Sequence, residues 1–231
     1  MKFPIRLVVM DIAGTTVKDD GAVNAVFRTV LQSEGIDIAE SDADAVMGMS
    51  KPVAIGALLE KYGLTADRRM VESLHARFVE QMTEHYRTRG VKPTKGAENT
   101  LDYLKRRGIT VFLDTGFDRS VADAILASLQ WQERGLIAGS VTSDEVERGR
   151  PFPDMIFRAM ALAGVNDPAS VAKVGDTVVD LEQGRTAGCG LIVGVLSGSG
   201  TREQLIERPH DFLLPDVSFL PAVLEGTYAG S

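Results

Sequence analysis

The fold is decided by the stretch Leu7-Val8-Val9-Met10-Asp11-Ile12-Ala13-Gly14-Thr15-Thr16. An unbroken apolar run that ends in a carboxylate and a Gly-Thr-Thr turn is typical of a buried parallel strand. Open α/β sheets bind their ligands outside the carboxyl ends of such strands, so Asp11 is a candidate nucleophile. An Asx turn or a helix cap is the alternative explanation for a single Asp in this position.

The next clear strand signal comes only at 109–113, before Asp114-Thr115-Gly116. The intervening residues show apolar positions at helical spacing and no strand signal. The predicted helices lie at 23–34, 42–46, 53–62 and 66–88, with Gly35, Gly48, Gly63 and Gly90 between or after them. A block of this size can form a small domain of its own, so we expect residues 17–92 to be a helical cap.

From residue 93 onward, helix and strand patterns alternate. Further strands are predicted at 140–142, 171–174, 191–195 and 212–214, the last at an edge, and helices at 98–107, 119–129, 153–163 and 180–187. Repeated βα units imply parallel strands joined by right-handed crossovers. The predicted class is therefore α/β: residues 1–16 and 93–231 form a three-layer, Rossmann-like doubly wound sheet, and the all-helical cap is inserted into it.

The composition of the chain limits the kinds of partner that it is expected to bind. The chain has 231 residues and a formal charge of −7, which argues against nucleic acid or an anionic membrane surface as a partner. Its single cysteine, Cys189, cannot form an internal disulfide, which favours a reducing cytoplasm. The apolar start is too short for a secretory signal, and no apolar run is long enough to cross a bilayer. We expect a cytoplasmic protein that acts on a small molecule.

Polar stretches follow several predicted strands, and a parallel sheet brings such stretches to one edge. They are Asp11–Thr16, Asp114-Thr115-Gly116, Gly149-Arg150-Pro151 and Gly175-Asp176-Thr177, with Asp180 shortly after. Singly, each has an ordinary explanation as a turn, a helix start or a surface guanidinium. Their occurrence together in this order indicates a site.

The residue types suit a metal ion and a phosphoryl group. Asp11, Asp176 and Asp180 supply the hard oxygen ligands that Mg²⁺ prefers, and the backbone carbonyl of Ala13 adds another. The Thr115 hydroxyl and the Gly116 amide can donate to phosphate oxygens. The Arg150 guanidinium can bind the same oxygens through its planar fork.

With these motifs and the cap in the expected gap, the sequence resembles the haloacid dehalogenase superfamily of Mg²⁺-dependent phosphotransferases. The resemblance implies a Rossmann-like core and an aspartyl-phosphate intermediate on Asp11. Phosphatases of this superfamily carry a second Asp two residues after the nucleophile as a general acid, and this chain has Ala13 there. Loss of a general acid typically costs ~10² to 10⁴ in rate, so we expect poor hydrolysis of ordinary phosphate esters.

Within the superfamily the sequence looks most like the phosphonoacetaldehyde hydrolases, or phosphonatases. The shared stretches are 11–17, 47–51, 149–153, 174–178 and 193–195. In that family the lysine of a Met-Gly-x-x-Lys stretch forms an imine with the substrate aldehyde, and Lys51 holds this position. We place the substrate among Ala13, Thr15, Met47, Gly116 and Phe117. The resemblance also implies a homodimer formed through the cap.

An imine explains why Ala13 is tolerated. Cleavage of a carbon–phosphorus bond leaves a carbanion, and a protonated imine on the adjacent carbon takes up its electrons as an enamine, so no acid need protonate the leaving atom. Lys51 must first be neutral, yet an ordinary lysine pKa near 10.4 leaves about one amine in a few thousand neutral at pH 7. Burial beside Met47 and Met49, or proximity to Arg150 and Mg²⁺, would lower its pKa. The alternative is a lysine that only touches substrate or solvent.

Three family residues are replaced: the expected histidine is Ala54, the tyrosine is Phe117 and the cysteine is Gly21. The sequence therefore predicts a phosphonatase-like hydrolase in which Asp11 attacks phosphorus, Lys51 forms the imine, and Thr115 and Arg150 hold the phosphonate. The alternatives are a phosphomonoesterase with an atypical acid and base, a haloacid dehalogenase, and a catalytically silent sensor of phosphorylated ligands.

Overall fold

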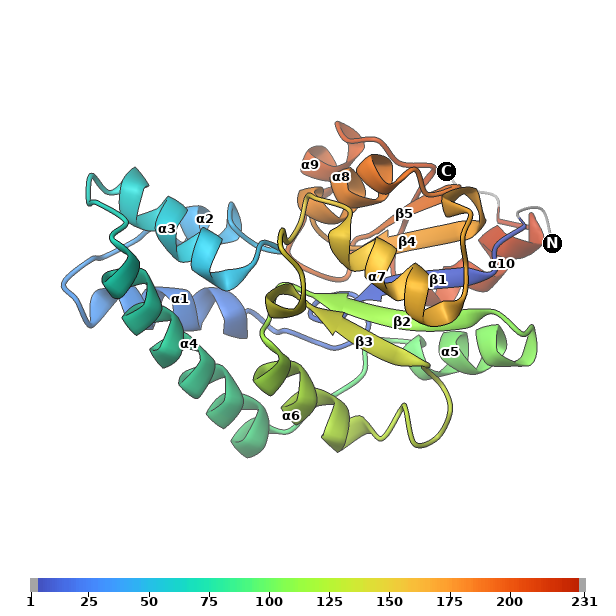
Figure 1. Ribbon diagram of the computed structural model, residues 1–231, viewed down its shortest axis with the longest axis horizontal. Coiled ribbons are helices and arrows are strands. Elements are labelled where there is room, and N and C mark those ends of the chain that lie inside the picture. The colour runs from blue at the N-terminus through green and yellow to red at the C-terminus, as the bar shows by residue number, and fades with distance from the viewer. Residues whose placement is uncertain (1–3, 229–231) are drawn as a thin grey trace.

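The computed structural model of this chain describes residues 4–228 and contains one parallel sheet in the order β3-β2-β1-β4-β5-β6 (Figure 1). Its strands are β1 (Leu7–Asp11), β2 (Thr110–Thr115), β3 (Gly139–Thr142), β4 (Val171–Gly175), β5 (Leu191–Val195) and β6 (Phe212–Leu214). Strands β2 and β3 lie on one side of β1, and strands β4, β5 and β6 lie on the other. The strand order therefore reverses beside Asp11, which is where open α/β sheets bind ligands.

Helices cover both faces of this sheet. They are α5 (Ala97–Arg106), α6 (Arg119–Leu129), α7 (Asp154–Ala163), α8 (Val178–Ala187), α9 (Arg202–Ile206) and α10 (Leu220–Glu225). Alternate side chains of β1 point to opposite faces: Val8 and Met10 pack in the cluster that contains α5, α6 and α10, whereas Leu7 and Val9 pack against α7. The predicted three-layer, doubly wound class is confirmed.

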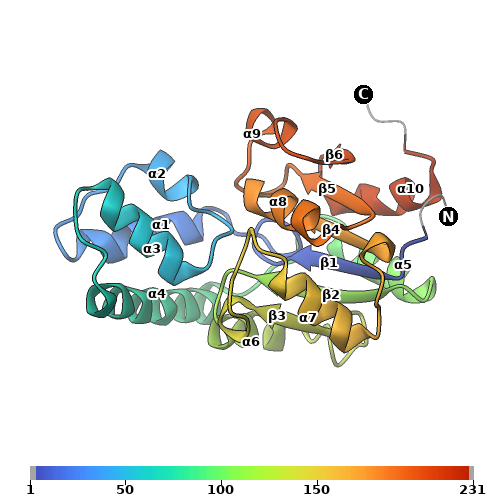
Figure 2. The same ribbon diagram turned by 45° about the horizontal axis from the view of Figure 1, so that its top comes forward.

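The remaining helices lie together beyond the carboxyl ends of the strands (Figures 1 and 2). They are α1 (Ala22–Gln32), α2 (Glu40–Asp44), α3 (Lys51–Lys61) and α4 (Arg68–Arg89). The side chain of Asp67 caps α4 by accepting from the backbone N–H groups of Arg69 and Met70. Four buried side chains spaced four residues apart turn one face of this helix inward, namely Leu74, Phe78, Met82 and Tyr86.

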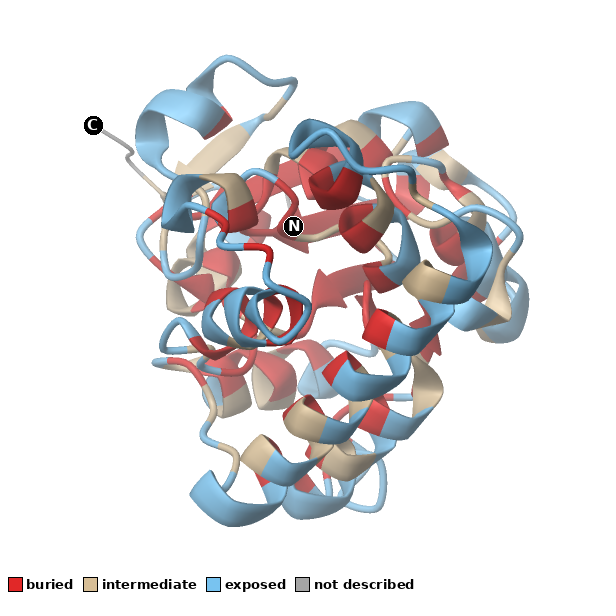
Figure 3. Ribbon diagram, turned by 90° about the vertical axis from the view of Figure 1, so that its left-hand side faces the viewer, coloured by how far each residue is buried: buried red, intermediate tan, exposed pale blue. Residues whose placement is uncertain are grey.

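Two connecting segments join these helices to the sheet, and they pair with each other. The backbone N–H of Lys18 donates to the carbonyl of Lys92 at 2.9 Å, and that of Thr94 donates to the carbonyl of Thr16 at 2.9 Å. Buried positions run through the strands while the outer faces of the helices are exposed (Figure 3). Over residues 4–228, no helix combines the length and apolar character needed to span a bilayer.

Two details differ from the sequence-based expectation. Helix α3 begins at Lys51 rather than at residue 53, because Pro52 occupies the first turn, where its missing N–H costs nothing. Helix α9 and the short 3₁₀ helices Ser143–Glu145, Pro168–Ser170 and Val217–Phe219 were not predicted, since they are too short to show a period. The first difference matters for the site, because it puts the Lys51 amine at a helix N-terminus.

Candidate active site

The floor of the site is a network of buried charges around Arg150. Its guanidinium contacts Asp11 at 2.7 Å, Asp114 at 2.7 Å and Asp180 at 3.1 Å. Lys173, on β4, reaches Asp114 at 2.5 Å and Asp180 at 2.9 Å, and it is fully buried. In-register pairing of β1 with β2 sets Asp11 beside Asp114, so the sheet itself brings these carboxylates together.

Sequence reasoning found Arg150 but missed Lys173 and the carboxylate of Asp114. The signal for Lys173 was a lysine inside the apolar strand 171–175, because a buried lysine requires a carboxylate partner. Its partner could not be found from the sequence, since Asp114 lies 59 residues away.

We expect Lys173→Met to lower the free energy of unfolding by about 3 to 5 kcal/mol, because it leaves two buried carboxylates with one cation fewer. Urea unfolding measures this change. The control is Arg106→Met, which removes a surface ion pair with Asp102 that solvent already screens. An effect of Lys173→Met no larger than that of the control would contradict a supporting role for the buried network.

The site carries more negative than positive charge. Four buried carboxylates, Asp11, Asp114, Asp176 and Asp180, outnumber the three buried cations of the site, Arg150, Lys173 and Lys51. Burial raises the pKa of Asp11 well above its ordinary value, against the attraction of Arg150 and with the repulsion of Asp180 and Asp176. Burial and Asp180 raise the pKa of Asp176 to about 6. A divalent cation would balance this excess.

The carboxylates differ in how free they are to bind such an ion. One oxygen each of Asp11, Asp114 and Asp180 lie within 4.8 Å of one another. Arg150 and Lys173, however, already hold Asp114 and Asp180, and neither of these carboxylates lines the cavity above the sheet. Asp11, Asp176 and Ala13 do line it, so these residues fit a hard cation such as Mg²⁺. Asp180, predicted from the sequence as a further metal ligand, does not line this cavity but lies within reach of Asp11.

Asp180 and Thr15 both orient other groups. Asp180 accepts from the backbone N–H of Thr177 at 3.2 Å and so closes a capping box at the start of α8. The Thr15 hydroxyl is fully buried and donates to Asp176 at 2.8 Å. Thr15 does not line the cavity, so it holds a carboxylate in place rather than facing a substrate. Ser199 donates its backbone N–H to the other oxygen of Asp176 at 2.9 Å.

The roof of the site is the loop that leads into α3. A Cβ on Gly116 would lie 2.3 Å from the carbonyl oxygen of Met49, and one on Gly48 would lie 2.3 Å from the Thr177 hydroxyl. Gly48 also has a φ of 79°, which favours glycine. Arg150 donates to the Gly48 carbonyl at 3.4 Å. These close approaches seat the loop directly on the carboxyl ends of the strands.

Lys51 follows this loop and is only 4% exposed. Its amine lies 4.9, 5.4 and 5.8 Å from the ring centres of Phe117, Phe27 and Phe78. It donates to the Met49 carbonyl at 3.4 Å, and within residues 4–228 no carboxylate forms an ion pair with it. Burial lowers the pKa of Lys51 to about 8, against an opposing effect of Asp11. Roughly one amine in ten is then neutral at pH 7.

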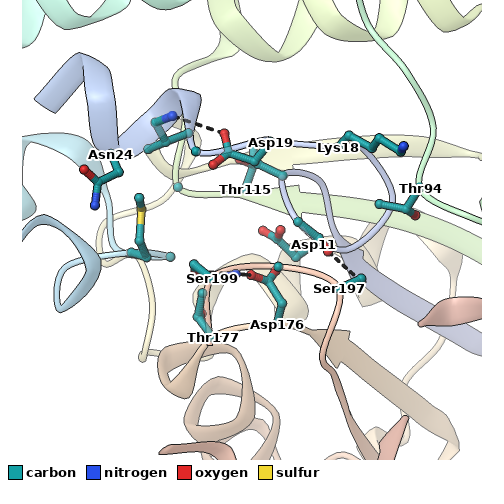
Figure 4. A pocket seen from close by; sticks show the side chains of 18 of the residues that line it. Asp11, Lys18, Asp19, Asn24, Thr94, Thr115, Asp176, Thr177, Ser197 and Ser199 are labelled. Atoms are coloured by element: carbon teal, nitrogen blue, oxygen red, sulfur yellow. Dashed lines mark hydrogen bonds between the residues drawn. The ribbon is translucent and has the colours of Figure 1, made fainter. Parts of the chain in front are cut away.

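Floor and roof enclose a cavity of about 520 Å³ (Figure 4). Most of the residues predicted from the sequence line it, namely Asp11, Ala13, Met47, Lys51, Thr115, Gly116, Phe117, Arg150 and Asp176. The Thr115 hydroxyl accepts from the Phe117 N–H at 3.1 Å and keeps its own proton for a ligand. Polar residues that sequence reasoning did not single out also line the cavity, among them Asp19, Asn24, Asp44 and Ser197.

Comparisons with known proteins agree with this geometry. A family model of haloacid dehalogenase-like hydrolases matches residues 5–188. A phosphonoacetaldehyde hydrolase from Bacillus cereus is 32% identical over 220 residues, which cover 88% of this chain and 81% of that protein. The phosphonoacetaldehyde hydrolase of Hahella chejuensis (strain KCTC 2396) is 30% identical over 208 residues, covering 85% and 70%.

Solved structures share the fold. A hydrolase from Pseudomonas syringae superposes with a TM-score of 0.87 at 21% identity, covering 97% of this chain and all of that one. A phosphonoacetaldehyde hydrolase-like protein from Oleispira antarctica superposes with a TM-score of 0.82 at 23% identity, covering 97% and 92%.

Proposed function

The chain belongs to the haloacid dehalogenase-like hydrolases and is related to the phosphonoacetaldehyde hydrolases among them, and from this premise we propose that it cleaves the carbon–phosphorus bond of phosphonoacetaldehyde or a related carbonyl phosphonate. The observation that carries the proposal is the buried Lys51 amine, which lines the same cavity as Asp11. An ordinary phosphatase has no need of a neutral lysine there. The cavity also lacks an acid at position 13, where the chain has Ala13.

The first step belongs to Lys51. Its neutral amine adds to the aldehyde carbon, and loss of water gives a protonated imine. The surrounding rings of Phe27, Phe78 and Phe117 exclude water and lower the cost of keeping the amine uncharged. The N-terminus of α3 acts in the same direction, because the positive end of a helix dipole disfavours an ammonium group.

The second step belongs to Asp11. A carboxylate oxygen forms a bond to phosphorus, the carbon–phosphorus bond breaks, and its electron pair moves into the imine to give an enamine. Protonation of the enamine and hydrolysis release acetaldehyde and free Lys51, and water releases phosphate from Asp11. Arg150 orients the Asp11 carboxylate through the 2.7 Å contact, while Thr115 and the Gly116 N–H face the phosphonate oxygens.

A Mg²⁺ ion held by Asp11, Asp176 and the Ala13 carbonyl would neutralise the charge between the carboxylate and the phosphonate. The proposal rests on the excess of buried carboxylates over buried cations in the site and on the hard oxygen ligands that line the cavity.

The test of the function is direct. Protein incubated with phosphonoacetaldehyde and Mg²⁺ should release acetaldehyde and phosphate in equal amounts. With borohydride added, peptide mass spectrometry should find a reduced adduct on Lys51. Turnover of sugar phosphates or phosphoglycolate without an adduct would instead identify a phosphomonoesterase.

Removal of the metal ion with a chelator should separate imine formation at Lys51 from phosphate release. Treatment with EDTA is expected to abolish phosphate release, whereas the reducible adduct on Lys51 should still form, because imine chemistry does not need the ion. Added Mg²⁺ should restore phosphate release and raise the midpoint of thermal unfolding, since it binds only the folded chain. In Asp176→Asn both responses to Mg²⁺ should weaken. Full phosphate release in EDTA would refute the metal assignment.

The pKa of Lys51 can be measured without catalysis. Burial lowers it to about 8, so the amine should lose its proton well before that of an ordinary lysine. In ¹³C NMR of lysine Cε groups, one resonance should titrate with a midpoint near pH 8 and should be absent in Lys51→Arg. A Lys51 resonance that titrates near 10.4 would mean that the amine is solvated.

A further inference from the structure

Imine formation at Lys51 requires proton transfers in which the surrounding aromatic rings cannot take part. At neutral pH most Lys51 amines are protonated, so a base must take a proton before the amine attacks. The hydroxyl of the resulting carbinolamine must then gain a proton to leave as water. The amine contacts the rings of Phe27, Phe78 and Phe117 and the Met49 carbonyl, and none of these titrates.

Four carboxylates deserve comparison for this role. Asp11 is held by Arg150 and faces the phosphorus position. Asp118 contacts His75 at 3.0 Å and does not line the cavity. Asp44 lines it but accepts from the Asn24 amide at 2.6 Å. Asp19 lines it: one oxygen accepts from the Val23 N–H at 3.1 Å, the backbone N–H of Gly21 also stabilises its charged form, and within residues 4–228 no side chain donates a hydrogen bond to it.

Asp19 lies between the sheet and α1, on the side of the cavity nearest the helical cap, across from Asp176 (Figure 4). Asp19 and Lys51 line the same cavity, and each acts on the other: the negative charge of Asp19 raises the pKa of Lys51, and the positive charge of Lys51 lowers the pKa of Asp19. Burial is the largest influence on Asp19 and raises its pKa above the ordinary value, against the Val23 N–H, Lys51 and His85. A carboxyl group of raised pKa is a stronger base when ionised, which helps it to accept a proton and later return it.

A second titratable group near Asp19 is the hydroxyl of Tyr86. Its hydroxyl is buried and has no hydrogen-bond partner among residues 4–228. It lines a neighbouring cavity together with Asp19 and His85. Burial, Asp19 and Asp11 raise the pKa of Tyr86, so the phenol keeps its proton and cannot be the base. Among the groups compared, Asp19 is the one suited to proton transfer.

We propose that Asp19 is the acid–base residue of imine formation at Lys51, an inference that rests on the function proposed above. The Asp19 carboxylate takes a proton from the Lys51 ammonium group. The free amine forms a bond to the aldehyde carbon, and the nitrogen proton passes to the carbonyl oxygen to give a carbinolamine. Asp19 then returns its proton to that hydroxyl, the carbon–oxygen bond breaks, and water and the protonated imine result. The residue ends ionised, as it began.

The experiment measures how fast Lys51 is trapped. Wild type and variants are incubated with phosphonoacetaldehyde and cyanoborohydride, and the reduced adduct on Lys51 is followed by mass spectrometry. Asp19→Asn keeps an acceptor for the Val23 N–H but cannot transfer a proton, so it should slow the adduct about 10²-fold or more at pH 7. Asp37→Asn removes an exposed carboxylate between α1 and α2 and should leave the rate unchanged.

Two further readouts exclude a merely structural effect. In wild type the proton of Lys51 passes to Asp19, so the rate should vary little with pH from about 8 down to the pKa of Asp19, below which the carboxylate is protonated and cannot accept. In Asp19→Asn the proton must go to water, and the rate should fall about tenfold per pH unit below a pH of about 8. In Asp19→Ala, added formate should restore part of the rate. The midpoint of thermal unfolding checks that each variant is folded.

The outcomes separate the two proposals. A slow variant with the altered pH profile and formate rescue supports Asp19. Equal adduct rates in wild type and Asp19→Asn across the pH range would overturn the role of Asp19 and leave the proposed function intact. If wild type forms no adduct at all, the proposed function itself fails, and the role of Asp19 fails with it.

Discussion

Replacement of Asp11 with Asn is expected to reduce phosphate release from phosphonoacetaldehyde on the order of 10⁴-fold or more, the scale on which loss of a covalent catalytic group acts. The amide has nearly the shape of the carboxylate but cannot attack phosphorus. Because Lys51 and Asp19 remain, the reducible adduct on Lys51 should still form. Accumulation of adduct without phosphate would show that carbon–phosphorus cleavage needs Asp11 and imine formation does not.

Asp11→Asn also removes a charge from the Arg150 network, and this effect needs a control. Asp114→Asn removes a charge from the same guanidinium at the same distance, 2.7 Å, but from a carboxylate outside the cavity. It should destabilise the fold and lower the rate far less than Asp11→Asn. If Asp11→Asn released phosphate within about tenfold of wild type, or if both variants lost the same rate, a nucleophilic role for Asp11 would be excluded.

The parts of the site that the sequence predicted are those encoded locally. The run Leu7–Asp11 is a strand because it is apolar and unbroken, and its last residue has to lie at the edge of the sheet. The same reasoning placed Thr115 at the carboxyl end of β2 and Asp176 directly after β4. The topology alone then brings these side chains together, because parallel strands of one sheet have their carboxyl ends at the same edge. No long-range contact had to be guessed.

The parts that were missed depend on which helix packs on which. The cage around Lys51 takes Phe27 from α1 and Phe78 from α4, whose rings lie 4.6 Å apart. Each phenylalanine looks like an ordinary core residue in its own helix, and only the packing of α1 on α4 turns them toward the amine. The partial burial of Asp19 is equally non-local, because the residue belongs to a polar run, 18–20, that is typical of an exposed turn.

Arg150 illustrates a third limit of prediction from the sequence, which is the choice of binding partner. Its position beside the site followed from the sequence, where a guanidinium was expected to bind phosphate oxygens. The structure gives its nitrogens three carboxylate neighbours, Asp11, Asp114 and Asp180. A residue type predicts what a side chain is able to bind, whereas the choice among partners depends on which charges the sheet buries nearby. Arg150 thus orients the proposed nucleophile.

Lys51→Arg should abolish the reducible adduct and reduce acetaldehyde release on the order of 10⁴-fold or more, because a guanidinium keeps the positive charge but forms no imine. Without an imine the electron pair of the carbon–phosphorus bond has no acceptor, and Ala13 offers no acid in its place. The matched control is Lys61→Arg, the same substitution at the exposed far end of α3. It should leave both the adduct and acetaldehyde release unchanged.

A second substrate distinguishes loss of the imine from general damage to the site. An activated phosphate ester such as p-nitrophenyl phosphate needs little protonation of its leaving group, so whatever turnover Asp11 and Mg²⁺ give it should survive in Lys51→Arg and vanish in Asp11→Asn. Lys51→Arg would then be unable to form the bond to the carbonyl carbon, and Asp11→Asn would be unable to form the bond to phosphorus. Acetaldehyde release by Lys51→Arg within about tenfold of wild type would show that electrons leave the carbon–phosphorus bond by another route, and Lys51 would be reduced to a residue that only touches the substrate.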